Sequence, residues 1–322
     1  MGDTLFTLPA LCALKNHFQD AKISCVLGRT SAPLLENHPC VDERIILPAN
    51  AFKEKLKSFS ALKSKHFDAA VLFQHTLLNA LYAKMLGVPV RAALDWKGCG
   101  GLLTHKIPYD AGWHEAERYL KIAGLLGAQG ERKYELHVTS REREEAKNML
   151  KALNIEQDDF IAGLFPGTSE KWKIKRWSEE RFAALADRMN EAAGAKIIVL
   201  GGAEDEKCVR NVVSKMSAPA VNLCGKTTLR QLAALTSLCR VVISNDTGPM
   251  HLAAACGANV IDICGQSNPG KTGPLSEKAV VVRKDIPCSP CRRLECDHRS
   301  CLELITVDEV MEVVKKVSGL KV

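Results

Sequence analysis

The sequence predicts an α/β protein built from two doubly wound lobes. Short runs of apolar and β-branched residues alternate with longer amphipathic segments along most of the chain. This pattern is typical of parallel sheets covered by helices on both faces. The 322 residues also exceed one typical hydrophobic core. A charged stretch at 131–159 separates two such series and is the expected hinge.

The N-terminal lobe is expected to begin with a helix, because Gly2 and Asp3 are followed by leucines at helical spacing. A strand normally precedes such a Gly-Asp turn, so we expect that the first strand of this lobe is missing from the chain. The glycines between 97 and 109 lack the spacing of a dinucleotide-binding turn, and that segment is expected to be a mobile loop. The other expected elements are strands at 23–27, 44–47, 69–73 and 91–94 and helices at 32–37, 52–65, 76–86 and 114–126.

The C-terminal lobe repeats the alternation of strands and helices after a hinge helix that starts at Arg141. Ser178 and Thr306 are expected to cap the helices that follow them. The expected domain limits are 1–155, 156–305 and a last helical segment at 306–322. The expected elements are strands at 160–165, 196–200, 221–223, 240–244, 259–264 and 280–282 and helices at 179–193, 205–216, 229–238, 251–255 and 308–317.

The composition is that of an ordinary globular protein, with 46% apolar and 25% charged residues. No apolar run reaches the roughly 18 residues of a membrane-spanning helix, and no signal peptide opens the chain. A cytoplasmic protein is therefore expected. The net charge of +7 favours an anionic substrate or a membrane surface. Because this charge is spread out and no nucleic-acid-binding motif is visible, we expect no nucleic-acid partner.

The stretch at 241–255 predicts an anion site. An apolar β-branched run ends in Asp246 and Thr247, which are residue types that favour helix starts, and Pro249 suits a first helical turn. Gly248 lets the backbone approach a ligand closely. The N-terminus of the helix would then direct unpaired N–H groups at an anion. Cations that could assist are Lys171, Lys173, Lys175 and Arg176. An ordinary strand-to-helix connection would give the same pattern.

Four segments, which follow one another along the chain in the same order as in the family, resemble glycosyltransferase family 9, the ADP-heptose:lipopolysaccharide heptosyltransferases. Residues 246–255 resemble the family signature, and 165–167 with 175–178 resemble the turn of its nucleotide lobe. Residues 1–11 are similar to its N-terminal Gly-Asp helix, and 266–270 to a late loop. The resemblance implies the GT-B architecture, with two Rossmann-like lobes, the sugar nucleotide on the C-terminal lobe, the acceptor on the N-terminal lobe and the reaction in an interdomain cleft.

The resemblance assigns catalysis to two residues. Asp3 would be the base that takes the proton from the acceptor hydroxyl, although taken alone it is more simply a helix N-cap. Lys175 would stabilise the charge that develops on the diphosphate leaving group. Arg176 or Lys173 could share that role or belong to a solvated basic face. With these cations no metal and no cofactor are expected, and no Asp-x-Asp pair of the metal-dependent kind is present.

The remaining site residues would bind substrate. Glu206 matches the acidic residue that holds the nucleotide ribose, with Glu204 and Asp205 close enough to replace it, and Thr227 falls near the adenine pocket. His251 would stand by the diphosphate, although a helix histidine beside apolar residues is more often structural. The others are Thr168 and Ser169, which offer hydroxyls to the diphosphate, Thr247 and Gly248, which cradle its other side, and Asp246, which binds heptose hydroxyls.

The 13 cysteines fall into two groups. Nine are scattered through apolar segments and are expected to be small buried hydrophobic residues in a reducing compartment. The other four form a C-x2-C-x4-C-x4-C run at Cys288, Cys291, Cys296 and Cys301, with His298 inside it. Such spacing could hold zinc. We prefer to interpret the run as a local structural cluster or as disulfides. Structural zinc sites more often pair two C-x2-C knuckles, and only one is present here.

The resemblance thus implies an inverting transfer of heptose from ADP-heptose to the inner core of lipopolysaccharide. The enzyme would work in the cytoplasm, in peripheral contact with the inner membrane. A sugar-nucleotide epimerase or a heptosyltransferase acting on a protein would keep the fold and change the reaction. A nucleotide-binding protein made inactive by the missing strand is the alternative from another class. N-lobe cations that could meet an anionic acceptor, or only form a solvated face, are Lys53, Lys55, Lys57, Lys63 and Lys65.

Overall fold

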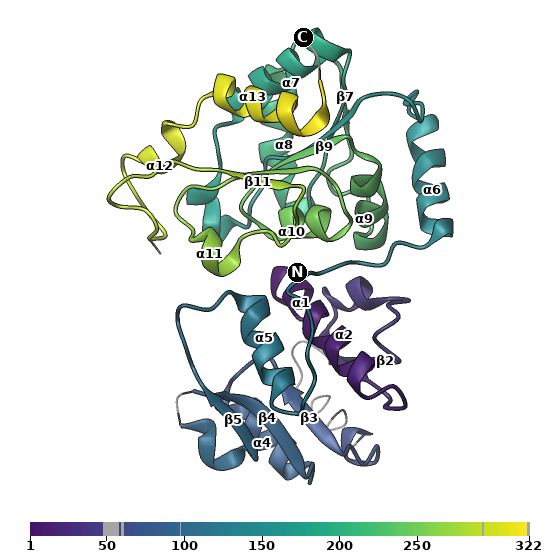
Figure 1. The fold of residues 1–322 in the computed structure, drawn as a ribbon. Coiled ribbons are helices and arrows are strands. Elements are labelled where there is room, and N and C mark those ends of the chain that lie inside the picture. Colours follow the sequence, from purple (N-terminus) through teal and green to yellow (C-terminus); the bar gives the residue numbers. More distant parts are fainter. Residues whose placement is uncertain (48–57, 59–60, 97, 292, 321–322) are drawn as a thin grey trace. The chain divides into compact units, whose positions relative to one another are not determined.

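The structure, a computed structural model, describes residues 1–47, 58, 61–96, 98–291 and 293–320 (Figure 1). The helix expected at 52–65 lies largely outside these residues, as do Lys53, Lys55 and Lys57. The chain divides into two compact units after Leu136. Each unit is described by itself, and the domain limits inferred from the sequence remain predictions.

The N-terminal unit contains two parallel sheets, one formed by β1 and β2 and the other in the order β3-β4-β5. Helix α5 packs against all three strands of the second sheet and against α2. The elements of this unit are α1 (Gly2–Phe6), α2 (Leu8–His17), β1 (Ser24–Gly28), η1 (Ala32–Leu35), β2 (Glu43–Leu47), β3 (Ala69–Leu72), α4 (Leu77–Met85), β4 (Val90–Asp95), η2 (Cys99–Leu102), β5 (His105–Pro108) and α5 (Glu115–Gly124).

The segment at 97–109, expected to be a mobile loop, is not a loop throughout, because its described part contains η2 and the strand β5. Only Ile107 in β5 is not exposed, so the strand shows almost no apolar signal. Its conformation comes from pairing with β4, in a register that runs from Ala92 opposite His105 to Asp95 opposite Pro108. A proline at the end of an edge strand is tolerated because the N–H it lacks would face solvent.

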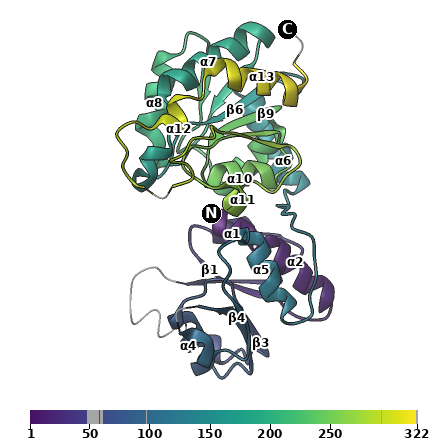
Figure 2. The same ribbon diagram turned by 60° about the vertical axis from the view of Figure 1, so that its left-hand side comes forward.

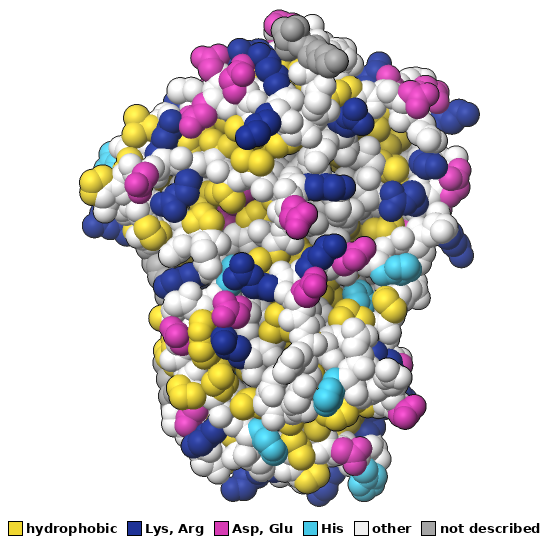
Figure 3. Space-filling view, in the orientation of Figure 1, with side chains coloured by type: hydrophobic (Ala, Val, Ile, Leu, Met, Phe, Trp, Pro, Cys, Tyr) yellow, Lys and Arg dark blue, Asp and Glu magenta, His cyan; other side chains and the backbone are white. Residues whose placement is uncertain are grey.

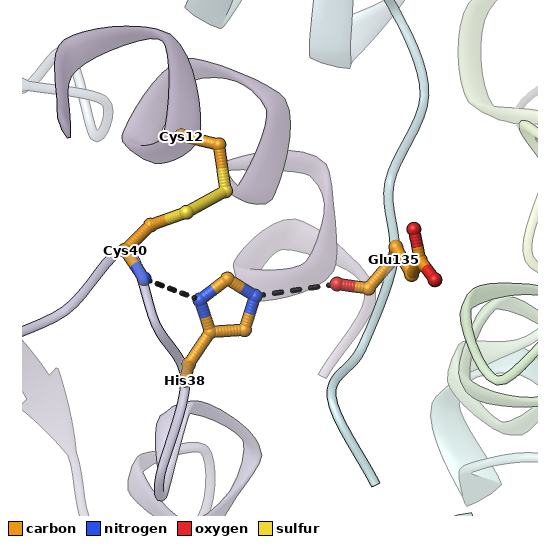
Figure 4. Close-up of a disulfide and its surroundings, with 4 residues drawn as sticks. All are labelled: Cys12, His38, Cys40 and Glu135. Atoms are coloured by element: carbon orange, nitrogen blue, oxygen red, sulfur yellow. Dashed lines mark hydrogen bonds between the residues drawn. A yellow bond between two sulfur atoms is a disulfide. The ribbon is translucent and has the colours of Figure 1, made fainter. Parts of the chain in front are cut away.

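The nine scattered cysteines are not all single thiols, as the sequence led us to expect. Cys12 on α2 and Cys40 form a disulfide that spans 28 residues (Figure 4). The other seven are free. Burial raises the pKa of Cys239 and Cys256 to about 12. Those thiols therefore stay protonated, in agreement with their expected role as buried hydrophobic residues.

The C-terminal unit is built on one parallel sheet in the order β11-β10-β9-β6-β7-β8. Figure 2 shows its strands β6 and β9. The elements of this unit are α6 (Ser140–Lys151), β6 (Ile161–Phe165), η3 (Glu170–Lys175), α7 (Glu179–Ala193), β7 (Lys196–Val199), η4 (Ala203–Asp205), α8 (Glu206–Lys215), β8 (Ala220–Asn222), α9 (Leu229–Leu238), β9 (Val241–Asn245), α10 (Gly248–Ala255), β10 (Val260–Ile263), α11 (Pro269–Thr272), β11 (Ala279–Val282), α12 (Ser300–Glu303) and α13 (Val307–Ser318).

Helices cover both faces of this sheet, as expected for a doubly wound fold. Helices α7, α8 and α13 form a core with every second residue of the central strands, for example Leu164 and Ile243. Helix α10 packs on β9 and β10, and α9 packs on α10. Each residue of β6, β9 and β10 is buried. Because successive side chains of a strand point to opposite faces of the sheet, these central strands are covered on both faces. Burial on both faces explains why they appear as continuous apolar runs in the sequence.

None of the described helices is long and apolar enough to cross a membrane. Figure 3 shows Lys and Arg side chains interspersed with Asp and Glu over one face of the molecule. The excess of positive charge is therefore not gathered into a single patch on this face.

Candidate active site

The predicted site residues of the C-terminal unit all follow strands of its sheet. Thr168, Ser169 and Lys175 follow β6, Glu206 follows β7, Thr227 follows β8, and 246–251 follow β9. All these strands are parallel, so the structure brings the residues to one edge of the sheet. Strands β9 and β6 are neighbours although a large part of the unit separates them in sequence. Connections diverge at such a point and leave a crevice for ligands.

Lys175 and Asp246 form an ion pair across this switch point. Lys175 Nζ lies 2.8 Å from Oδ2 of Asp246 and 3.4 Å from its carbonyl oxygen. The side chains are 20% and 7% exposed, so water screens the pair only in part. The Lys175 ammonium also lies 5.3 Å from the ring centre of Trp172. These contacts place one fixed positive charge beside the loop that leads into α10.

The neighbouring cations have other partners, which separates Lys175 from its alternatives. Arg176 donates to the carbonyl oxygen of Thr168 at 2.7 Å and to its Oγ1 at 3.1 Å. Lys173 is exposed and lies 3.9 Å from Glu170. Arg176 therefore holds the turn after β6 together, and Lys173 belongs to a solvated face. Lys175 is the cation directed at the loop after β9.

The two predicted hydroxyl residues after β6 differ in their surroundings. Thr168 is buried, and its Oγ1 donates to the carbonyl oxygen of Trp172 at 3.1 Å. Its hydroxyl thus holds η3 in place. Ser169 is exposed at the start of η3, and its side chain makes no capping hydrogen bond there. Ser169 is the residue of the pair whose hydroxyl is open to a ligand.

The N-terminus of α10 lacks a side-chain cap. Thr247 occupies the N-cap position, but its hydroxyl donates to the carbonyl oxygen of Asn245 at 3.2 Å instead of accepting from the first turn. Gly248 and Pro249 form that turn and are partly exposed, whereas His251 is buried. The sequence predicts an open helix start here, and the structure has one. Unpaired N–H groups and the helix dipole favour an anion at such a position.

Asn245 organises the site and was missed in the sequence. Its side chain is fully buried, accepts from the N–H of Trp177 at 2.8 Å and donates to the carbonyl oxygen of Pro166 at 2.8 Å. Trp177 is itself buried and donates to the carbonyl oxygen of Ile305 at 3.0 Å. The amide of Asn245, at the end of β9, thus holds the segment that follows β6 at two points, one before Lys175 and one after it. A polar residue at the end of an apolar run is the signal that could have found it.

Asp262 on β10 is a second residue that the sequence analysis missed. It is fully buried, and neither carboxyl oxygen has a hydrogen-bond partner among the described residues. Burial raises the pKa of Asp262 well above its usual range; the charge of Asp246 raises it further, while Lys175 opposes the shift. Burial thus favours the neutral form of Asp262 beside the Lys175–Asp246 pair.

The acidic cluster after β7 contains one structural and two exposed residues. Asp205 is buried and accepts from the N–H of Gly202 at 3.0 Å. A Cβ at Gly167 would lie 2.1 Å from Cγ of Asp205, so these residues pack without space between them. Glu204 and Glu206 are exposed, and Glu206 lies 3.5 Å from Arg210. Asp205 is thus packed inside the turn, whereas Glu206 and Glu204 are exposed to a ligand.

The loop that carries Thr227 lies beside this acidic cluster. Gly225 donates to the carbonyl oxygen of Gly201 at 3.0 Å and adopts a φ of +68°. A Cβ at Gly225 would lie 3.3 Å from Cα of Ala203. Thr227 is partly exposed and precedes Thr228, the N-cap of α9. The residues predicted to hold ribose and adenine are thereby brought together.

Asp3 lies in the N-terminal unit. It is exposed in the first turn of α1, whose N-cap is Met1, so the interpretation of Asp3 as the N-cap itself is wrong. Leu5 and Phe6 anchor this short helix in the core, where Phe6 packs edge-on against His114 at a ring separation of 5.2 Å. The charge of Asp3 contributes to the raised pKa of Tyr119, after burial and the charge of Glu115. A carboxylate on a fixed helix is thus available to a ligand of this unit.

The cysteine-rich run packs on the loop after β10. The hydroxyl of Ser289 donates to the carbonyl oxygen of Gly265 at 2.8 Å, and the N–H of Cys291 donates to that of Gln266 at 2.8 Å. The alternative of disulfides is wrong, because Cys288, Cys291, Cys296 and Cys301 are all free. In the described part of the chain these sulfurs do not meet as a group of metal ligands, although the charges of Cys291, Cys288 and Cys296, after burial, raise the pKa of Cys301. The choice between a structural cluster and a zinc site stays a prediction.

Two solved structures share this fold. The ADP-heptose lipopolysaccharide heptosyltransferase II of Escherichia coli is 24% identical, with a TM-score of 0.84 over 99% of this chain and 96% of that one. A family 9 glycosyltransferase of Veillonella parvula is 21% identical, with a TM-score of 0.87 over 99% and 94%. The fold class predicted from the sequence, two Rossmann-like α/β lobes of the GT-B type, is confirmed.

Comparison of sequences gives the family. The lipooligosaccharide heptosyltransferase 2 of Campylobacter jejuni is 26% identical over 98% of this chain and 94% of its own length. The lipopolysaccharide heptosyltransferase 2 of Salmonella typhimurium is 28% identical over 88% and 85%. The profile of glycosyltransferase family 9 (heptosyltransferase) matches residues 55–301. The chain is a glycosyltransferase and belongs to this family, as its motifs indicated.

Proposed function

We propose that this protein is an inverting glycosyltransferase that moves heptose from ADP-heptose to the inner core of lipopolysaccharide. The single observation that carries the proposal is family membership over most of the chain, with relatives named lipopolysaccharide heptosyltransferase 2. The Escherichia coli heptosyltransferase WaaC, 21% identical with TM-scores of 0.77 and 0.72, was solved with ADP and with ADP-2-deoxy-2-fluoro heptose. An ADP-sugar donor is therefore the first substrate to test.

The donor is assigned to the C-terminal unit. Its diphosphate would lie between Lys175 and the open N-terminus of α10, where Thr247, Gly248 and the nearby His251 line the other side. Ser169 would add a hydroxyl, with Thr168 holding the turn from behind. Negative charge builds on the diphosphate as it leaves, so donors fixed in place before the reaction lower the barrier. We assign this neutralisation to protein groups rather than to a divalent metal.

Other residues would orient the rest of the donor. Glu206 would accept hydrogen bonds from the ribose hydroxyls, with Glu204 as the alternative, and Thr227 would border the adenine. Asp246 would bind heptose hydroxyls. It is held by Lys175 at 2.8 Å, so a sugar hydroxyl that donates to Asp246 would also be positioned relative to the diphosphate.

Asp3 would act as the base in a direct displacement. Its carboxylate accepts the proton of the acceptor hydroxyl, the hydroxyl oxygen forms a bond to the anomeric carbon, and the bond from that carbon to the diphosphate oxygen breaks. ADP leaves with the electron pair, and the configuration at the anomeric carbon inverts. A positioned base of this kind contributes about 10²–10⁴ to the rate.

The acceptor would bring the protein into peripheral contact with the cytoplasmic face of the inner membrane. Its phosphates and carboxylates agree with the net charge of +7. Of the cations proposed to meet it, Lys65 already pairs with Glu43 at 2.6 Å. Lys63 is exposed and stays a candidate.

The experiment is an assay of purified protein with ADP-heptose and defined truncated core acceptors, in the presence of a chelator. We expect ADP release that depends on the acceptor and is unaffected by the chelator. Epimerised ADP-heptose formed without acceptor would identify an epimerase instead. ADP binding without any turnover on these acceptors would identify a nucleotide-binding protein.

The Asp3→Asn variant tests the base, because it keeps the size of the side chain and removes its basicity. Turnover is expected to fall by about 10²–10⁴, while ADP affinity measured by calorimetry stays at the wild-type value. Asp20→Asn, which changes another exposed carboxylate of the same unit, should leave both unchanged. Near-normal turnover of Asp3→Asn would remove Asp3 from the mechanism.

A further inference from the structure

Three potential metal ligands that have no role in the proposed reaction lie together in the N-terminal unit. The sulfurs of Cys12 and Cys40 and a ring nitrogen of His38 all lie within 4.8 Å of one another (Figure 4). His38 is 4% exposed and Cys40 is 9% exposed. The three come from α2 and from the segment after η1, which are distant in sequence. The fold therefore assembles a compact set of two sulfurs and one nitrogen.

Both ring nitrogens of His38 have hydrogen-bond partners. Nε2 lies 3.2 Å from the carbonyl oxygen of Glu135, and Nδ1 accepts from the N–H of Cys40 at 3.3 Å. A carbonyl only accepts, so the proton of the neutral ring is assigned to Nε2. Metal-bound histidines likewise donate from their second nitrogen to a carbonyl or carboxylate, and a metal at Nδ1 would replace the hydrogen bond from Cys40.

The donor set selects a particular class of metal. Two thiolates and a neutral imidazole suit a borderline-soft divalent ion, above all zinc. In a tetrahedral site with Zn–S bonds of about 2.3 Å, the two sulfurs stand about 3.8 Å apart. The disulfide holds them at bonding distance, so it excludes the metal. Reduction would let the sulfurs separate, and the fold already places the imidazole beside them.

We propose that Cys12, His38 and Cys40 bind one zinc ion in the dithiol form of the protein, and that the disulfide is the metal-free, oxidised form of the same site. Binding releases the two thiol protons and forms two Zn–S bonds and one Zn–N bond, with the fourth position open to water. Oxidation by a small disulfide such as oxidised glutathione forms the Cys12–Cys40 bond and releases Zn²⁺. The two electrons reduce the small disulfide to two thiols.

The site would fasten α2 to the segment after η1 in either redox state. Helix α2 directly follows α1, which carries Asp3. Zinc in a reducing compartment and the disulfide in an oxidising one would thus support the same local packing. This proposal does not depend on the proposed heptosyl transfer. Neither the residues assigned to binding the sugar-nucleotide donor nor Asp3 would be ligands of the zinc ion.

The test uses full-length protein in which Cys288, Cys291, Cys296 and Cys301 are replaced by Ser, so that those sulfurs cannot take up metal. The protein is reduced, loaded with Zn²⁺, freed of excess metal by gel filtration and analysed for zinc by mass spectrometry. We expect one equivalent in this background. Cys12→Ser, Cys40→Ser and His38→Gln should each lose most of it. Cys25→Ser, at a buried cysteine of the same unit, should retain it.

A second arm avoids variants that could fail to fold. The same background protein, oxidised with glutathione disulfide until Cys12 and Cys40 are linked, should hold no zinc and regain one equivalent after reduction. Co²⁺ in place of Zn²⁺ should give the sulfur-to-cobalt charge-transfer band and the d–d bands of a tetrahedral thiolate site. Absence of stoichiometric metal in the reduced protein, or equal metal in its oxidised form, overturns the proposal. So does full retention by a folded Cys12→Ser variant.

Discussion

Lys175, the last residue of η3, shows how one side chain can serve two roles. Its ammonium is the partner of a buried carboxylate, and in the proposed function it is also the cation that meets the diphosphate. The charge of Asp246 also raises the pKa of the buried Asp262, after burial itself. Removal of Lys175 would therefore leave a buried charge without its partner as well as a weaker anion site, and both effects are measurable.

The first residue-scale prediction compares Lys175→Met with Lys173→Met. Loss of a charge-assisted hydrogen bond costs about 1.5–3 kcal/mol, so Lys175→Met should weaken ADP binding by about 10- to 100-fold. It should also lower the melting temperature, because Asp246 is left unpaired. Lys173 is exposed, and its replacement should change neither. Calorimetry and thermal unfolding measure the two effects, and equal effects of both variants would contradict the assignment.

The second residue-scale prediction concerns Asp262 and pH. Its pKa is raised in the folded protein, first of all by burial, whereas an unfolded aspartate titrates near 3.9. The unfolded state thus loses this proton first, and the residue lowers stability progressively as pH rises above about 4. Asp262→Asn removes the titration and keeps the shape. The melting temperature of Asp262→Asn relative to wild type should therefore increase between pH 4 and pH 8, and a pH-independent difference would show that Asp262 does not titrate in this way.

At the scale of elements, one carboxylate both starts α6 and fastens it to α9. Glu142 accepts from the N–H of Thr139 at 2.8 Å in a capping box. Its oxygens also accept from Nε and Nη2 of Arg230 on α9 at 2.7 and 2.6 Å. Arg230 is buried and donates to the carbonyl oxygen of His137 as well. The helix expected in the charged hinge is therefore docked by a specific ion pair in addition to its buried apolar residues Ala146 and Leu150.

The prediction for these elements follows from the pKa of Glu142, which hydrogen bonds from Arg230 lower to about 2. Stability from this pair is present above the ordinary pKa of glutamate and is lost as pH falls from about 4.5 toward 2. Glu142→Gln should cost about 2–3 kcal/mol at pH 7, with the difference from wild type shrinking in acid. Glu145→Gln breaks an exposed pair with Arg141 on the same helix and should cost less than about 1 kcal/mol. Denaturant titrations at pH 7 and pH 3 measure this, and equal costs would refute it.

Local patterns predicted most elements because their signals lie in a few adjacent residues. The caps Ser178 and Thr306 accept the expected bonds at 3.2 Å each, and α7 spans the predicted residues. Strand β5 was missed because its pairing with β4, and not its own residues, makes it a strand. The disulfide was missed because spacing in the sequence does not show which cysteines meet in space.

For the molecule as a whole, the βα alternation predicted the parallel sheets, and parallel strands brought the site residues of the C-terminal unit to one edge. The resemblance singled out Lys175 and Glu206, and their surroundings could not be predicted from the sequence. In the structure Lys175 is set apart from Lys173 and Arg176 by its contact with Asp246, and Glu206 from Asp205 by its exposure. The site roles remain predictions, whereas the family and the fold are established.

The packing of Asp205 against Gly167 makes two positions on different loops interdependent. An alanine at 167 would collide with the carboxyl group, because its Cβ would lie 2.1 Å from Cγ of Asp205. Alanine at 205 would not remove the obstacle, because Cβ of Asp205 would itself lie only 2.6 Å away. Mutational tolerance at 167 is therefore conditional on 205, and an evolutionary path through this turn has to reduce residue 205 to glycine before it can enlarge residue 167.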